Sequence, residues 1–204
     1  MNREAKEREI NQLRSRISQL EAELSTEQAQ GEWPPKGYYT AYHVLAGFVL
    51  GMFGAATSLL FNVVGSLLVG QHPLQLIRVY LTFPLGAEAL TIDGGVTLAV
   101  GCCLYLATGM LLGIPFHLLL TRWLPQASFG ARLAAVSVLA VLVWIVNYYA
   151  ILAWLQPLLL GGRWIVDLIP WWVAALTHLI FGWTMLLVQP LGVFVPYATR
   201  PEER

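Results

Sequence analysis

Four long stretches of this chain contain no charged residue, and they constrain its fold more than any other feature. They run from 37 to 77, 94 to 121, 133 to 162 and 168 to 199. A helix needs about 20 apolar residues to cross a bilayer, and each stretch is longer. A soluble domain of this size could not bury so much apolar surface. The sequence therefore predicts an all-α, polytopic membrane protein, a four-transmembrane-helix bundle with helices at 41–69, 96–120, 134–160 and 171–195.

The few charges that flank these stretches predict an orientation. Only 12% of the residues are charged and the net charge is zero, and since there is no basic patch, no nucleic-acid partner is expected. Lys and Arg near the helix ends are more numerous on one side (Lys36, Arg122, Arg132 and Arg200) than on the other (Arg78 and Arg163). The positive-inside rule then predicts a multi-pass protein of the inner cell membrane, surrounded by lipid, with both termini in the cytoplasm.

The first thirty residues carry a different pattern, an apolar seam with alternating steps of three and four. Its members are Ile10, Leu13, Ile17, Leu20 and Leu24. Isoleucine at a and leucine at d favour two parallel strands. Segment 1–30 is therefore predicted to be a cytoplasmic coiled-coil helix that forms a parallel homodimer through residues 9–24. The alternative is a solvated amphipathic helix that lies on the membrane or on a partner subunit.

Three short segments complete the predicted organisation. Residues 31–40, which contain "GEWPPKG", read as a Pro/Gly linker because two prolines cannot continue a helix. Residues 41–198 form the membrane domain, and 199–204 form a cytoplasmic tail. Within the domain, 73–84 is too short to span and is predicted to be an interfacial helix between the first and second transmembrane helices, with Arg78 extending to the headgroups. A docking face for another subunit is the alternative.

Small residues recur along the first two membrane helices at helical spacing. Transmembrane helices associate through close packing, which small residues permit. The predicted packing positions are Gly47, Gly51, Gly54, Ser58, Asn62 and Gly65 in the first helix and Gly109 and Gly113 in the second. These stripes indicate that the first helix packs on the second. Contact with another chain is the alternative.

Polar side chains inside the spans should point inward, because an amide facing lipid is unsatisfied. A buried polar network is predicted from Asn62, Asn147, Thr177 and His178, with Tyr148 beside them. One interpretation is a set of interhelical hydrogen bonds that fixes the helix register, with His178 bonded to the first or third helix. The other is a lining for a bound headgroup or a quinone.

Chemistry-bearing residues are scarce in the spans. None contains Asp, Glu, Lys or Arg, which ion-coupled carriers usually place near the midplane, and no catalytic or metal motif is present. The chain is therefore predicted not to be an enzyme and to hold no cofactor. The alternative is a b-type haem, for which His43 and His117 are the candidate axial ligands.

These patterns favour a non-catalytic accessory or scaffold subunit. It would pack against other membrane-protein subunits of a larger complex, for example one of the respiratory type, and oligomerise or dock through its N-terminal coiled coil. The alternative is a small haem- or quinone-binding anchor for electron transfer. A passive channel or a lipid-handling protein is a further alternative.

Overall fold

The structure, a computed structural model, describes residues 9–10, 12–21, 23 and 36–194. The chain divides into two compact units, Met1–Tyr38 and Tyr39–Arg204. In the described part of the first unit, residues 9–10, 12–21 and 23 are helical, and their apolar seam is exposed: Ile10, Leu13, Ile17 and Leu20 are 44–57% exposed. Leu24, the fifth seam position, lies outside the described residues, as do 31–35 of the linker and the tail 199–204.

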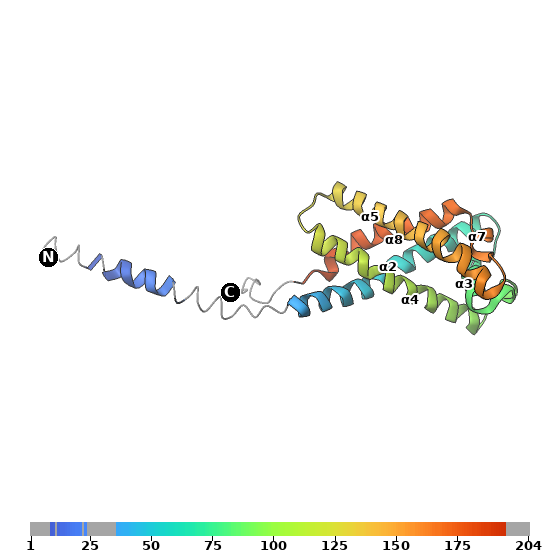
Figure 1. Ribbon diagram of the computed structural model, residues 1–204, viewed down its shortest axis with the longest axis horizontal. Coiled ribbons are helices and arrows are strands. Elements are labelled where there is room, and N and C mark those ends of the chain that lie inside the picture. Colours follow the sequence, from blue (N-terminus) through green and yellow to red (C-terminus); the bar gives the residue numbers. More distant parts are fainter. Residues whose placement is uncertain (1–8, 11, 22, 24–35, 195–204) are drawn as a thin grey trace. The chain divides into compact units, whose positions relative to one another are not determined.

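Four long helical segments build the second unit (Figure 1). The first is α2 (Lys36–Leu68), and the second is α4 (Val96–Leu118) with the π-helical η2 (Leu119–Trp123). The third joins α5 (Phe129–Ile145), the π-helical η3 (Val146–Leu152) and α6 (Ala153–Leu160). The fourth is α8 (Trp171–Val188), which ends in the 3-10 turn η4 (Gln189–Gly192). Across the described residues the secondary structure is all helical.

All four segments are long and apolar enough to cross a membrane. Their outward side chains are apolar as well, since Leu60 is 61% exposed and Leu187 is 70% exposed. A water-soluble protein would cover such a surface with polar groups. The four-helix prediction is therefore confirmed, and the fold is that of a multi-pass helical membrane protein.

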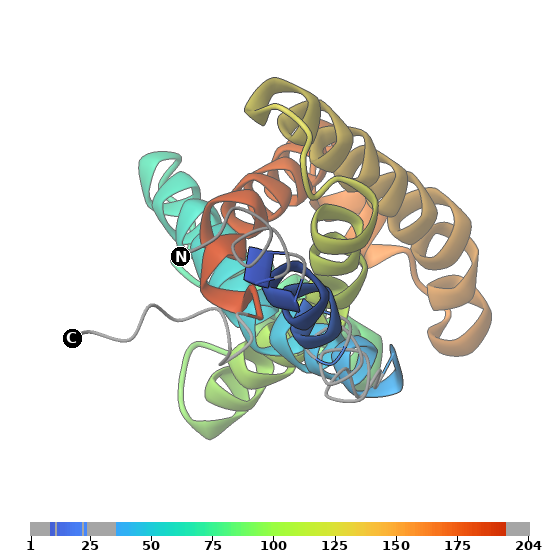
Figure 2. The same cartoon turned by 90° about the vertical axis from the view of Figure 1, so that its left-hand side faces the viewer.

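The segments alternate in direction, so that their connections gather at the two ends of the bundle (Figure 1). One end carries α3 (Gln75–Leu85), the 3-10 turn η1 (Gly86–Thr91) and α7 (Trp164–Leu168). The other end carries the α4–α5 connection and the end of α8. Seen along the helices, α5 and α8 lie side by side, and α8 also contacts α4 (Figure 2).

Two helix starts differ from the sequence prediction. α2 begins at Lys36 rather than 41, so 36–40 is helical although it was predicted as linker. The third segment begins at Phe129 rather than 134, because the Ser128 hydroxyl accepts a hydrogen bond from the Ala131 N–H at 3.4 Å and caps the first turn. The apolar pattern alone did not reveal this cap.

Prolines account for two further differences. α8 gives way to η4 at Gln189 rather than continuing to 195, because Pro190 has no N–H to extend the helix. The third segment widens into η3 just before Pro157, whose ring crowds the preceding turn. π-helical turns inside α-helices are frequent at functional sites, and η3 carries Asn147 and Tyr148.

The predicted interfacial segment 73–84 corresponds to α3, and α3 packs closely on α4. Ile77 and Leu81 are fully buried against Gly101, where a Cβ atom would lie 2.6 Å from the Ile77 Cγ2 atom. Arg78, which was predicted to extend to the headgroups, donates from its Nε to the Ile92 carbonyl at 2.6 Å, and its guanidinium pairs with Asp93. This pairing joins α3 to the chain just before α4.

Candidate functional site

The small residues of α2 and α4 bring these two helices into backbone contact. A Cβ atom at Gly51 would lie 2.8 Å from the Met110 Cα and 3.0 Å from the Gly113 Cα. A Cβ atom at Gly47 would lie 2.9 Å from the Ile114 Cα. Real side chains do not approach so closely, so only glycine allows this packing.

The rest of the predicted stripe has other neighbours. Gly54 faces the Phe181 ring of α8, 2.8 Å from where its Cβ would lie, whereas nothing lies within 4 Å at Gly65. Gly109 packs on Gly51 and also on Ala55, which the predicted stripe omitted. α2 is thus wedged between α4 and α8, and its small residues serve two contacts rather than one.

The predicted polar network is only partly assembled. The Asn62 amide donates to the Thr177 hydroxyl at 2.9 Å and to the Ser58 carbonyl at 2.8 Å. The bond to Thr177 joins α2 to α8. His178 was expected to bond to the first or third helix. Instead its Nδ1 bonds to the Ala174 carbonyl of its own helix at 2.8 Å. The Asn147 side chain has no hydrogen-bond partner among the described residues.

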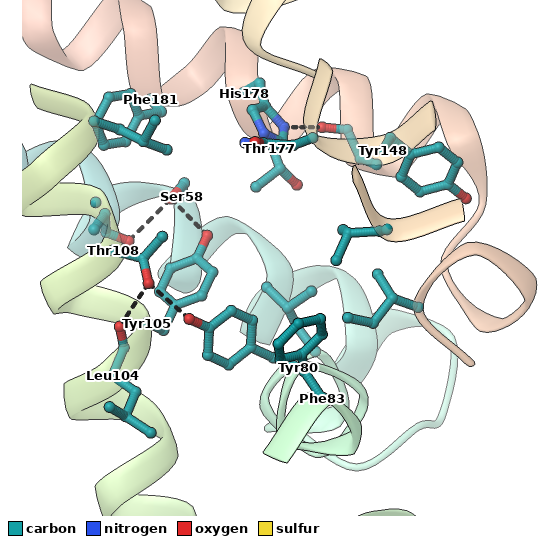
Figure 3. A pocket seen from close by; sticks show the side chains of 18 of the residues that line it. Ser58, Tyr80, Phe83, Leu104, Tyr105, Thr108, Tyr148, Thr177, His178 and Phe181 are labelled. Atoms are coloured by element: carbon teal, nitrogen blue, oxygen red, sulfur yellow. Dashed lines mark hydrogen bonds between the residues drawn. The ribbon is translucent and has the colours of Figure 1, made fainter. Parts of the chain in front are cut away.

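A cavity of about 570 Å³ lies beside this network, between α2, α3, α4, η3, α7 and α8 (Figure 3). Asn147, Thr177 and His178 all line it. Two further lining residues, Leu111 of α4 and Ile151 of η3, are 61% and 38% exposed. The cavity is therefore continuous with the apolar outer face of the bundle between α4 and η3, the face that lipid would cover.

The cavity wall is mostly apolar, with a few neutral polar groups and no Asp, Glu, Lys or Arg. The polar lining residues are Ser58, Tyr80, Tyr105, Thr108, Asn147, Tyr148, Thr177 and His178. An apolar cavity with a few placed polar groups is typical of a small-molecule site. A charged ligand would find no counter-charge in this wall.

The two histidines proposed as haem ligands meet at the opposite end of the bundle from α3. The His43 Nδ1 and the His117 Nε2 lie 3.4 Å apart, and His117 is fully buried. Two axial bonds of about 2 Å each would hold such nitrogens about 4 Å apart, with a macrocycle between the rings. The Gly47 and Gly192 backbones pack against His117, so the pair does not fit a haem. Within the described residues, no three His, Cys, Asp or Glu side chains gather as metal ligands.

The sequence analysis did not predict one buried polar residue near the cavity, Gln156. Gln156 of α6 is fully buried, donates to the Thr82 hydroxyl of α3 at 2.8 Å and accepts from the Ile165 N–H of α7 at 3.1 Å. It ties together the three short helices α3, α6 and α7. A glutamine inside an apolar run was the available signal, because such an amide needs partners.

No family model, no curated protein and no solved structure matches this chain. The fold and site alone define it as a multi-pass helical membrane protein with a cavity that opens on its apolar face.

Proposed function

We propose that this protein binds a neutral, apolar molecule of the surrounding bilayer, without converting it chemically. The observation that carries this proposal is the cavity, which is large enough for part of a lipid-sized molecule and continuous with the apolar outer face. A ligand could enter sideways from the bilayer and bury apolar surface without crossing water. This is the lipid-handling or quinone-binding role rather than the haem-binding one.

The test is photolabelling of the full-length protein, purified in mild detergent, with a long-chain hydrocarbon that carries a diazirine. We expect the label on peptides from the cavity walls, 104–112 and 147–152. Ala107→Phe narrows the cavity from α4, and we expect it to reduce this labelling several-fold. Ala99→Phe is the matched control, since Ala99 is an exposed residue of the same helix outside the cavity lining. Equal labelling of both variants and wild type would refute the proposal.

A second candidate function is that of an accessory subunit, favoured by the exposed seam of the N-terminal helix. Four large apolar side chains lie along one face of a helix that is otherwise polar. Such a face is stabilised when a partner covers it. A parallel pair would place Glu9 opposite Arg14 and Arg16 opposite Glu21, so both pairs have opposite charges. We propose this pairing as a coiled coil on the cytoplasmic side.

The proposed setting is the inner cell membrane with both termini in the cytoplasm, which the arginine and lysine asymmetry supports. In this orientation α3 lies at the outer interface. Its length supports this position, because 11 residues cannot span a bilayer.

A further inference from the structure

We propose that the cavity selects a neutral lipid that carries a hydroxyl group, recognised by His178 and Asn147. This inference rests on the proposed ligand-binding function and adds the chemical class of the ligand. It follows from counting which polar hydrogens of the cavity wall are already used inside the protein (Figure 3).

The hydroxyls on the α4 side have no proton left for a ligand. Ser58 donates to the Ala55 carbonyl at 3.0 Å, so in its bond with Tyr105, at 2.9 Å, the tyrosine is the donor. A hydroxyl has one proton and can give it once. In the same way Thr108 donates to the Leu104 carbonyl at 3.0 Å. In the 2.6 Å bond between Tyr80 and Thr108, the donor is therefore Tyr80.

The hydroxyls on the opposite wall are used in the same way. The Tyr148 hydroxyl has the carbonyl oxygens of Val166 and Ile169 at 2.9 Å and 2.5 Å, and its single proton is shared between them. The Thr177 hydroxyl donates to the Val173 carbonyl at 2.8 Å. All six hydroxyls of the lining thus keep only acceptor lone pairs for a ligand.

His178 offers an acceptor as well. A carbonyl cannot donate, so the bond to Ala174 places the ring proton on Nδ1. The Nε2 atom of the neutral ring is then an acceptor, and it has no partner among the described residues. Asn147 is the exception in this wall, because its amide has both a donor and an acceptor without a protein partner.

A ligand hydroxyl can use both the free acceptor of His178 and the free donor of Asn147. It can donate to His178 and accept from Asn147, whereas a ketone, an ether or the ring oxygens of a quinone can only accept. An acceptor-only ligand would leave the histidine nitrogen desolvated without a bond, which is costly in an apolar site. Since no charged side chain lines the cavity, a carboxylate or phosphate headgroup is disfavoured too. The inferred class is therefore a neutral lipid alcohol.

The test uses competition against the diazirine-bearing hydrocarbon on the full-length, detergent-purified protein. The competitors share one long alkyl chain and are a secondary alcohol, its methyl ether and the ketone with the same carbon skeleton. We expect the alcohol to compete about tenfold better than the other two, which corresponds to about 1.4 kcal/mol.

Two variants separate the recognition of the donor from that of the acceptor. His178→Phe keeps a flat ring but removes the acceptor, so the alcohol should lose its advantage over the ether. The ether should compete at least as well as with wild type, because no histidine nitrogen is then left desolvated without a bond. Asn147→Leu should weaken all three competitors alike, because each of them accepts. Ile151→Leu is the control within the lining, and it should leave the ratio of alcohol to ether unchanged. Binding of the ether to His178→Phe that is no weaker than to wild type shows that the variant keeps its cavity.

The outcomes distinguish this inference from the function on which it rests. If the hydrocarbon labels the cavity but alcohol, ether and ketone compete equally, or the ketone competes best, hydroxyl selection is overturned and ligand binding stands. If His178→Phe weakens alcohol and ether by the same factor, the assigned role of His178 is wrong. If the hydrocarbon does not label the cavity walls at all, both the inference and the proposed function fail.

Discussion

Individual glycines of α2 differ in what they do, although the sequence pattern treats them alike. Gly51 lies against the α4 backbone, whereas Gly65 has open space around it. We expect Gly51→Ala to lower the stability of the detergent-purified protein, by about 1–3 kcal/mol, because the new methyl group overpacks the helix contact. Gly65→Ala should be neutral or stabilise by up to about 1 kcal/mol, since alanine favours helix over glycine.

Thermal unfolding of both variants measures this difference. Both variants replace glycine by alanine in the same helix, so the contribution of helix propensity to the stability change cancels in the comparison. Equal effects at Gly51 and Gly65 would mean that α2 does not pack on α4 through these residues.

The bond between Asn62 and Thr177 is a direct polar link between α2 and α8. We expect a double-mutant cycle with Asn62→Leu and Thr177→Val to give a coupling free energy of about 0.6 kcal/mol, and at most about 1.7 kcal/mol, the range found for bonds between membrane helices. Unfolding in denaturing detergent measures each corner of the cycle. A coupling of zero would show that the two side chains contribute independently.

At the scale of elements, the N-terminal helix has a face that can be tested without the bundle being disturbed. If the seam pairs two chains, Ile17→Lys with Leu20→Lys should abolish cross-linking through a cysteine placed at Leu13. Two buried ammonium groups would have to meet at each of the two seam positions. Ser15→Lys with Ser18→Lys adds the same charge away from the seam and should leave cross-linking intact. Cross-linking that survives the seam variant would show that other parts of the protein hold the chains together.

The short helices at one end of the bundle depend on Gln156. The variant Gln156→Leu leaves the buried Ile165 N–H without its acceptor. We expect the free energy of unfolding to fall by about 1–3 kcal/mol. Hydrogen exchange at the Ile165 amide should become faster, because α7 loses its link to α6. Gln71→Leu changes an exposed glutamine near α3 and serves as the control. Unchanged exchange at Ile165 would remove Gln156 from its assigned role.

At the scale of the whole molecule, the orientation in the membrane is the main prediction. The lysine and arginine asymmetry predicts that both termini lie in the cytoplasm. Reporter fusions after Arg204 and within 161–168 should therefore give opposite signals, with the first on the cytoplasmic side. A C-terminal reporter outside the cytoplasm would reverse the proposed placement of α3 and of the cavity.

The sequence by itself determined the number of spans and their approximate limits. Charged residues are costly inside a bilayer, so their spacing marks each crossing whatever the helices later contact. Small residues likewise indicated that α2 has a closely packed face. The pattern could not assign partners, and the stripe is in fact divided, with Gly51 facing α4 and Gly54 facing α8.

Only the tertiary structure decided where the cavity lies and which polar groups remain available in it. Its wall combines six elements that together run from residue 55 to residue 181. The π-helical η3 contributes Asn147 and Tyr148 to it. His178 bonds within its own helix, which no spacing could distinguish from a bond between helices. Apolarity along a chain depends on single residues, whereas a void depends on how several helices fail to fill the space between them.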